Sequence, residues 1–372
     1  MKVLELLSSP AWTGPAEPMT SVARELVRRG HEVEVAVDTR REGDLRERLA
    51  AEGFPPRTEL ALSTKGGPLA FAGDVLRLRR MARGFDVLHA NFSNDHALAL
   101  LALPRRGARR VVRTLHSSRS LADRGLQGTV HRHTDGLVAV CEAHARVLRE
   151  RFGVPEERVL ATRGAVDAGA FLPEGPDLRA ELAIAPDAPV AGIVSRIKPD
   201  RRHAELVDAF RVVADRLPEA RLVVVGRGEG LEAVRARVAR QGLAGSVIFA
   251  GYRRGPSLAA AYRTLDAKVL LAEGNDGTCR ALLEGMAAGR PGVAYRLGAP
   301  AESILDGETG RLVPEGDVAA LARALLEVLG NPAGARAMGR AARRRMQAFF
   351  TEEARGAAVE AFLQRVLRMP PA

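Results

Sequence analysis

Short apolar segments alternate with stretches of helical periodicity in two similar series, and this alternation most constrains the fold of the chain. Two parallel strands need a long crossover between them, and a helix is the usual crossover. The alternation therefore predicts parallel sheets that are covered by helices on both faces. With 372 residues, the chain is long enough for two such domains, each with its own core.

The two series define two predicted domains and a final helical element. The strands expected in the first half are Val3–Leu7, Val33–Val37, Val87–Ala90, Val111–Leu115 and Leu137–Cys141. The strands expected in the second half are Val190–Val194, Leu222–Val225, Val247–Phe249, Ala267–Leu271, Val293–Tyr295 and Leu312–Val313. A passage rich in glycine and proline, from Arg163 to Pro189, predicts a linker between them. We place the domains at 1–168 and 169–350, and the last helix at 351–372.

Cysteine usage and hydropathy favour a cytoplasmic protein. Only two cysteines, Cys141 and Cys279, occur, and both stand in apolar or helical contexts, so no disulfide framework is expected. No apolar run approaches the roughly 20 residues of a membrane-spanning helix. The first residues, Met1 to Leu7, run directly into a strand and do not read as a signal peptide.

The formal charge of +11 at pH 7 is spread over both halves of the chain. Two arginine clusters stand out in the first half: Arg77, Arg79, Arg80, Arg105, Arg106, Arg109 and Arg110. Such clusters either bind an anionic surface, here the inner face of a cell membrane, or form an ordinary solvated face. A noncatalytic nucleic-acid-binding protein would also use this charge. The chain has no aromatic stacking cluster and no recognised nucleic-acid module, so we expect no nucleic-acid partner.

The most informative motif is a pair of acidic residues, Asp276 and Glu284, around the start of a predicted helix. The apolar run Ala267–Leu271 precedes the pair, and an Ala/Leu/Met-rich segment ending at Gly289 follows. A helix start offers unpaired N–H groups and a positive dipole end, which suit a diphosphate. One carboxylate could bind sugar hydroxyls and the other ribose hydroxyls. This spacing therefore indicates a nucleotide-sugar site.

The motif resembles that of the retaining GT-B glycosyltransferases of family four, which have two acidic residues with seven between them. The segment Leu282–Ala287 matches the family's Leu-Leu-Glu-Ala-Met-Ala-like helix closely. The first acid departs from the pattern, because the family has Glu-Gly-Phe-Gly there, whereas Asp276 is followed by Gly277, Thr278 and Cys279. Glu273 is a rival for the first acid, with a spacing that differs by three. The resemblance implies two Rossmann-like domains facing a cleft, with the C-terminal helix returning to the first domain.

A second element of the donor site follows the first strand of the second domain. The segment Ile193–His203 resembles the family motif in which an arginine and a lysine grip the diphosphate. Arg196 matches the arginine, and Arg201 stands in place of the lysine. Arginine keeps the charge and adds a bidentate fork for phosphate oxygens, so the role can be retained.

Glycine-containing loops after the next strands are expected near the nucleotide. The run Val223–Gly230 is similar to a dinucleotide-binding fingerprint, but its sixth position is Leu231 instead of glycine, which excludes the dehydrogenase reading. It resembles the family's Val-Gly-x-Gly turn, which places Gly226 beside the nucleotide. Tyr252 and Arg253, in the loop after the following strand, are expected there too.

In the first domain, the resemblance implies that Gly14 and His116 approach the donor. Gly14 lies in a turn-rich loop after the first strand, and His116 ends the strand Val111–Leu115. An ordinary turn and a structural histidine are the alternatives. His131 and His133, with Asp135, look like metal ligands at first sight, but their spacing lacks a fourth partner, so no metal site is expected.

The resemblance implies a retaining transfer from a nucleoside-diphosphate sugar, which we expect to be UDP-linked, to a hydroxyl of a glycan or lipid-linked acceptor of the cell envelope, as in lipopolysaccharide synthesis. The catalytic residues expected are His116, Arg196, Arg201 and Asp276. The donor-binding residues expected are Gly14, Gly226, Tyr252, Arg253, Gly277, Thr278, Cys279 and Glu284. No cofactor is expected, and the lack of an Asp-x-Asp sequence favours metal independence. A sugar-nucleotide epimerase of the same fold remains an alternative, which incubation with the donor alone would reveal.

Overall fold

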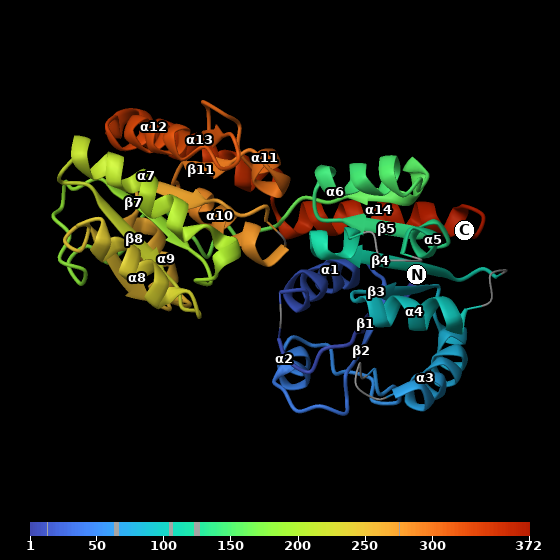
Figure 1. Cartoon of the computed structure of the whole chain (residues 1–372). Helices are drawn as coiled ribbons and strands as arrows, with labels where there is room; N and C mark the ends of the chain where they lie inside the picture. Colours follow the sequence, from blue (N-terminus) through green and yellow to red (C-terminus); the bar gives the residue numbers. More distant parts are fainter. Residues whose placement is uncertain (13, 63–66, 104–106, 123–126, 275) are drawn as a thin grey trace. The chain divides into compact units, whose positions relative to one another are not determined.

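The structure, a computed structural model, describes residues 1–12, 14–62, 67–103, 107–122, 127–274 and 276–372. Around the start of the helix at Asp276, side chains are described up to Gly274 and again from Cys279. The chain forms two compact units, Met1–Arg163 with Glu352–Ala372, and Gly164–Thr351. Each unit is built on one six-stranded parallel sheet (Figure 1), which confirms the predicted fold class.

The first unit has the strand order β2-β1-β3-β4-β5-β6. Its strands are β1 (Lys2–Leu7), β2 (Glu32–Val37), β3 (Val87–Ala90), β4 (Arg110–Leu115), β5 (Gly136–Ala139) and β6 (Val159–Ala161). Its helices are α1 (Ala16–Arg28), α2 (Leu45–Ala51), α3 (Gly67–Met81), α4 (Ser93–Ala102), α5 (Gln127–Arg132), α6 (Glu142–Arg146) and α14 (Glu352–Arg368). The sequence prediction missed β6, which has three residues and lies at the sheet edge.

The second unit has the strand order β12-β11-β10-β7-β8-β9. Its strands are β7 (Val190–Val194), β8 (Arg221–Val225), β9 (Val247–Gly251), β10 (Ala267–Leu270), β11 (Gly292–Tyr295) and β12 (Gly310–Val313). Its helices are α7 (His203–Arg216), α8 (Leu231–Arg240), α9 (Pro256–Thr264), α10 (Asp276–Ala287), α11 (Gly298–Ser303), α12 (Val318–Leu329) and α13 (Pro332–Phe349). All six strands expected in this half are present.

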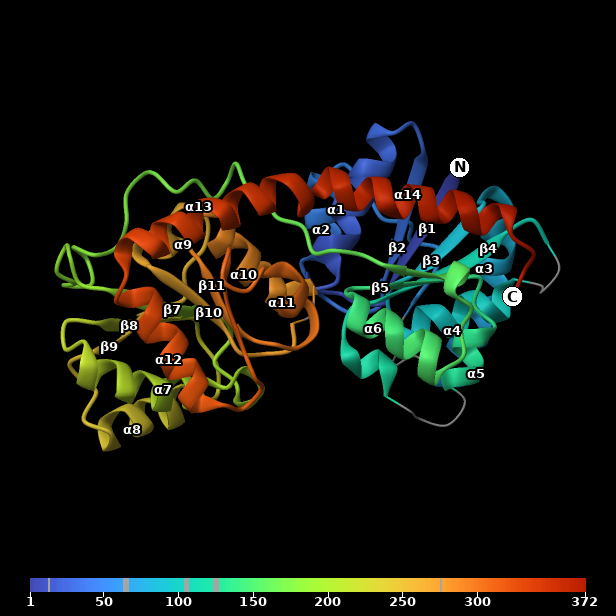
Figure 2. The same ribbon diagram turned by 90° about the horizontal axis from the view of Figure 1, so that it is seen from above.

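Helices lie on both faces of each sheet (Figure 2), and the alternation of side chains along the strands makes both faces apolar. In the first unit, Val3 belongs to the core with α1 and α14, whereas its neighbour Leu4 belongs to the core with α3 and α4. In the second unit, Val224 packs with α7 and α12, and Val223 packs with α9. Successive side chains of a strand point to opposite faces, so a continuous apolar run fills both cores.

The C-terminal helix α14 packs against α1, as the resemblance implied. Gly356 permits this close approach, because a Cβ there would lie 2.3 Å from Cβ of Glu25 on α1. Further along the helix, Phe362 and Val366 are buried and pack over β5, where Gly136 leaves the room that they need. The last segment of the chain thus completes the core of the first unit.

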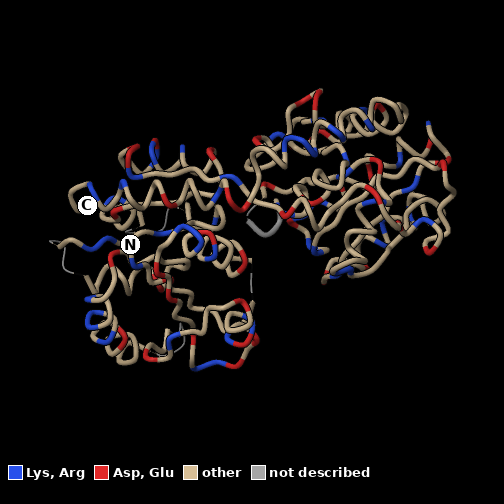
Figure 3. The backbone as a smooth tube through the Cα atoms, turned by 180° about the vertical axis from the view of Figure 1, so that it is seen from behind, with Lys and Arg blue, Asp and Glu red and all other residues tan. Residues whose placement is uncertain are grey.

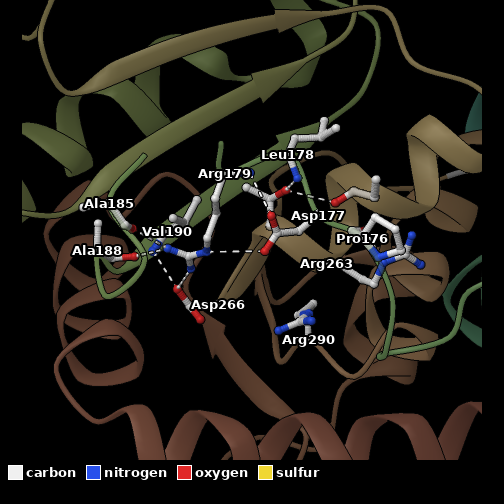
Figure 4. Close-up of polar contacts among 12 residues, drawn as sticks. Pro176, Asp177, Leu178, Arg179, Ala185, Ala188, Val190, Arg263, Asp266 and Arg290 are labelled. Carbon is white, nitrogen blue, oxygen red and sulfur yellow. Dashed lines mark hydrogen bonds and ion pairs between the residues drawn. The ribbon is translucent and has the colours of Figure 1, made fainter. Parts of the chain in front are cut away.

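The passage predicted as a linker packs onto the second unit, and arginines hold its backbone (Figure 4). The Arg179 guanidinium donates to the carbonyl oxygens of Ala185, at 3.1 Å, and Ala188, at 2.8 Å, and to the Asp266 carboxylate at 3.0 Å. Arg263 donates from Nε to the carbonyl oxygen of Pro176 at 2.6 Å. Guanidinium groups thus satisfy carbonyls that have no partner in a helix or strand.

Candidate functional site

The strand order of the second unit places the predicted donor-site residues at one edge of its sheet. The chain runs from β7 through β8 to β9 on one side, and then returns to β10 on the other side of β7. The loops after β7 and β10 therefore diverge, and ligands of such sheets bind at this switch point, outside the carboxyl ends of the strands. Arg196 and Arg201 follow β7, and α10 begins soon after β10.

Helix α10 presents its N-terminus at the switch point. Asp276 was expected in the loop just before this helix, and it is instead the first residue of α10. The N–H groups of a first helical turn have no acceptor within the helix, so they are available to an anion. The structure describes the backbone of Asp276, Gly277 and Thr278 as helical, but it does not describe their side chains or burial. Cys279 is buried, with Sγ 3.8 Å from Oγ of Ser303, so its side chain contributes to the core.

Glu284 is buried on α10 and has two partners that the sequence did not suggest. The hydroxyl of Tyr262 donates to Oε2 at 2.6 Å, and Nε of Arg280 lies 3.3 Å from Oε1. Burial, together with the Glu284 charge, raises the pKa of Tyr262 well above its usual value. The contacts with Tyr262 and Arg280 therefore hold the carboxylate in one orientation. The Tyr262 contact joins residues on different helices, which no local pattern reveals.

Lys268 is a buried amine on β10, beneath the same helix. Its Nζ donates to the carbonyl oxygen of Val269 at 2.7 Å, and its stem fills the space beside Gly285. A Cβ at position 285 would lie 2.6 Å from Cγ of Lys268, which explains glycine where the family motif has alanine. Burial lowers the pKa of Lys268 to about 7, against the opposing effect of the Glu284 charge.

The loop after β7 carries the two predicted phosphate-binding arginines. Arg196 is exposed. The Arg201 side chain is 16% exposed; its Nη1 lies 3.6 Å from the Asp200 carboxylate, and its Nε is buried with no hydrogen-bond partner among the described residues. The next residue, Arg202, has a left-handed backbone with φ of 58°. A buried, unpaired guanidinium N–H is costly, so Arg201 is the residue here best prepared for an anionic ligand.

The glycines after β8 allow two loops of the site to lie against each other. A Cβ at Gly226 would lie 1.9 Å from the carbonyl oxygen of Ser195, and one at Gly228 would lie 2.2 Å from that of Ile197. The amide of Ile197 donates to the carbonyl oxygen of Arg227 at 3.0 Å. Gly226 is therefore required by loop packing, whatever it contributes to a nucleotide.

Tyr252 and Arg253, after β9, differ in what they offer a ligand. Tyr252 is 60% exposed, and the guanidinium of Arg227 lies 4.7 Å from the centre of its ring. Arg253 donates from Nε to the carbonyl oxygen of Ala250 at 2.8 Å and pairs with Glu181. The Tyr252 ring is thus accessible to a ligand, whereas the contacts of Arg253 stabilise the loop.

In the first unit, the predicted residues lie in the loops after β1 and β4. Gly14 is exposed in the turn before α1. His116 is buried, and its Nε2 lies 2.9 Å from Oδ1 of Asn91. His131 is buried against Phe152, with Nε2 3.3 Å from the carbonyl oxygen of Ser120. Within the described ranges, no group of three or more His, Cys, Asp or Glu residues is arranged to hold a metal ion.

Comparison with known proteins identifies the family. Residues 14–169 match Glycosyltransferase Family 4, and residues 175–345 match Glycosyl transferases group 1. The GDP-mannose-dependent alpha-(1-6)-phosphatidylinositol monomannoside mannosyltransferase of Mycolicibacterium smegmatis is 30% identical over 282 residues, which are 72% of this chain and 74% of that protein. The chain is a glycosyltransferase of family four. This confirms the resemblance drawn from the Asp276–Glu284 motif.

Other relatives of this glycosyltransferase are similar along most of its length. The D-inositol 3-phosphate glycosyltransferase of Actinosynnema mirum is 30% identical over 362 residues, covering 84% of each chain. The structure of Anabaena Alr3699/HepE in complex with UDP superposes with a TM-score of 0.81 at 20% identity, over 98% of this chain and 100% of that one. The lipopolysaccharide outer core galactosyltransferase WaaB gives 0.78 at 15% identity, over 98% and 99%. These structural neighbours confirm the GT-B fold.

Replacing the buried lysine tests the electrostatics beneath Glu284. The Lys268 pKa is about 7 in the folded chain and about 10.4 when unfolded, so between these values only the unfolded chain carries the proton. The free energy of unfolding should therefore rise with pH in this window, by up to about 1.4 kcal/mol per pH unit from this group. Lys268→Met should remove that rise, as measured by urea denaturation at pH 7 and pH 9.

Lys2→Met is the matched control for this experiment. The pKa of Lys2 is raised by its hydrogen bond with Glu32, so this group does not titrate between pH 7 and pH 9. Its replacement should leave the pH dependence unchanged. Equal slopes for the native chain and Lys268→Met would show that the buried amine is not neutral at alkaline pH.

Proposed function

We propose that this glycosyltransferase moves a hexosyl group from a nucleoside-diphosphate sugar to a hydroxyl of a glycan or lipid-linked cell-envelope acceptor, with retention at the anomeric carbon. The observation that carries the donor assignment is Arg201, whose buried Nε has no partner among the described residues. It lies at the switch point of the second sheet, together with Arg196 and the N-terminus of α10. Two guanidinium groups and a helix N-terminus suit a diphosphate.

The proposed mechanism is electrostatic. As the diphosphate departs, negative charge grows on its oxygens and the sugar gains oxocarbenium character. Arg196, Arg201 and the first-turn N–H groups of α10 stabilise the growing charge, so they favour the transition state over the bound substrate. Glu284 accepts hydrogen bonds from the ribose, and Asp276 and His116 orient the donor sugar. No residue is assigned as a covalent nucleophile.

The donor base and the acceptor are proposed from the chemistry of the relatives. We propose a UDP-linked donor, as expected from the sequence, and a GDP-linked donor is the alternative that the name of the mannosyltransferase relative supports. The proposed acceptor is anionic, because names of the relatives include phosphatidylinositol and inositol phosphate and because this chain is basic. A thermal-shift screen of UDP- and GDP-sugars, followed by acceptor assays with the best donor, distinguishes these cases.

Arg201→Ala should lower turnover far more than it lowers stability. Loss of one group that stabilises the developing charge costs roughly 2.7–4 kcal/mol of barrier, or about 100- to 1,000-fold in rate. Arg201→Lys, which restores the residue type of the family motif, should recover most of the activity. Steady-state transfer at saturating donor gives these rates, with Arg216→Ala, at the exposed end of α7, as the control. Near-normal turnover of Arg201→Ala would contradict the phosphate assignment.

We also propose that the first unit binds the inner face of an anionic membrane through α3 and α4. Lys and Arg residues are spread over the chain (Figure 3). On α3, arginines accompany exposed apolar side chains. Leu69 is 91% exposed, Leu76 is 59% exposed, and Leu101 on the adjoining α4 is 63% exposed. Arg77, Arg79 and Arg80 are exposed beside them. Exposed leucines and arginines on one helix are typical of interfacial binding.

The second arginine cluster contributes less than the sequence suggested. Arg105 and Arg106 lie outside the described residues. Arg109 donates from Nη2 to the carbonyl oxygen of Arg83 at 3.2 Å. Arg110 is buried, and its guanidinium donates to the carbonyl oxygens of Gly107, at 2.7 Å, and Met369, at 2.6 Å. The expectation that Arg110 contacts a membrane is therefore wrong. No described helix is long and apolar enough to cross a membrane.

Replacing Arg77, Arg79 and Arg80 by glutamine should weaken binding to phosphatidylglycerol-containing vesicles. Each basic residue near an anionic surface contributes about 1 kcal/mol, so the triple variant should lose roughly 100-fold in affinity. The matched control replaces Arg216, Arg235 and Arg240, which are exposed helix arginines of the second unit. Co-sedimentation with vesicles at low and at physiological salt measures the binding of the triple variant and of the control. Equal binding of the native chain to neutral and anionic vesicles at low salt would rule out this membrane contact.

A further inference from the structure

Strand β1 contains a fully buried carboxylate, Glu5, in the middle of an otherwise apolar run. Its Oε1 lies 2.8 Å from Nδ1 of His89, and its Oε2 accepts a hydrogen bond from Nδ2 of Asn91 at 2.9 Å. Burying a carboxylate costs several kcal/mol unless hydrogen bonds compensate for the lost water. A leucine or valine would fill this position without that cost, so the contacts of Glu5 call for a reason beyond stability.

The hydrogen bonds of Asn91 fix the orientation of its side-chain amide. Its Nδ2 donates to Glu5 and also to the carbonyl oxygen of Leu6, at 3.2 Å. Both amide hydrogens are thereby used, so the side chain can offer only an acceptor, Oδ1, on its other side. Nε2 of His116 lies 2.9 Å from that Oδ1. His116 must donate there, which fixes the hydrogen of its neutral ring on Nε2 and leaves Nδ1 as the acceptor nitrogen.

The network spans three neighbouring strands and ends at the loop edge of the first sheet. Glu5 on β1 lies directly opposite His89 on β3, and β3 pairs with β4. The other nitrogen of His89 lies 2.8 Å from Oγ1 of Thr114 on β4. Asn91 and His116 are the residues that follow β3 and β4. The sheet thus holds the asparagine and the histidine at fixed positions beside its switch point, between β1 and β3.

We propose that Asn91, oriented by Glu5, is a positioning residue of the transfer reaction that sets the ring orientation and the Nε2–H tautomer of His116. This inference rests on the proposed function, in which His116 meets the donor sugar. An imidazole acts on a substrate hydroxyl through one defined nitrogen, so the wrong tautomer presents a donor where an acceptor is needed. In metal sites, replacing the outer residue that fixes a histidine ligand commonly costs roughly 10- to 100-fold in activity, and we expect a loss of similar size here.

The first test is spectroscopic and measures the tautomer in the native chain. Long-range ¹⁵N–¹H correlation spectra of the full-length protein, with His116 assigned by its loss in His116→Ala, report which ring nitrogen carries hydrogen. The Nε2–H tautomer is expected at a pH where the ring is neutral. An Nδ1–H tautomer would overturn the proposal. Because this measurement does not use substrate, it stays decisive even if the transfer reaction differs from the one proposed.

The second test is kinetic and uses Asn91→Leu, which keeps the size of the side chain and removes the acceptor. We expect kcat to fall about 10- to 100-fold while the KM for the donor changes less than about twofold. The control is Thr134→Val, which removes a buried hydrogen bond of the same kind, 2.8 Å from Oγ1 to Nε2 of His96, away from His116. A folded Asn91→Leu protein with kcat equal to that of Thr134→Val would overturn the proposal.

A double-mutant comparison separates a positioning role from general damage. If Asn91 acts only through His116, Asn91→Leu should change kcat less than about twofold in a His116→Ala background. A full further loss in that background would overturn the positioning role. Normal turnover of His116→Ala would overturn it too, while leaving glycosyl transfer itself in place. Absence of transfer by the native chain with every donor tested would contradict the proposed function, and the tautomer would still be measured.

Discussion

The parallel direction of the strands is the constraint on which the rest of the structure depends. Since all strands of a sheet run the same way, their carboxyl ends and the loops after them lie at one edge. In the second unit this places Arg196, Arg201, Tyr252 and the N-terminus of α10 at that edge, from two loops and a helix far apart in sequence. In the first unit the same rule brings together Asn91 and His116. The candidate site residues thus owe their common position to the sheet and not to local sequence.

Arginine side chains have two roles in this basic chain: some bond to backbone carbonyls, and others are available to a ligand. Several of the guanidinium groups described above donate to backbone carbonyls: Arg179 holds the passage before β7, and Arg110 holds the end of α14. Arg201 differs, because its buried Nε has no such partner among the described residues. A high arginine count therefore says little about ligands, and the environment of each guanidinium decides its role. This is why one cluster expected on a membrane surface proved partly structural.

The sequence predicted what depends on periodicity and spacing, and it missed what depends on contacts between distant residues. Eleven of the twelve strands were predicted from apolar runs. The prediction missed β6, because three residues at a sheet edge are too few to give a periodic signal. The Asp276–Glu284 pair was visible because both residues stand on one helix. Tyr262 and Lys268 reach Glu284 only after folding, so nothing local marks them. Glu5 appeared in the sequence simply as a polar residue inside the strand Val3–Leu7.

Calorimetry with free UDP and GDP tests the central claim, that the second unit holds the nucleotide with Glu284 on its ribose. Glu284→Ala should weaken binding of the preferred nucleotide by roughly 1.5–3 kcal/mol, since hydrogen bonds to a charged group are lost. Asp276→Asn should bind the free nucleotide like the native chain, because its proposed partner is the absent sugar, and Glu273→Gln should do the same. Native affinity in Glu284→Ala, or loss of binding in Glu273→Gln, would contradict the account.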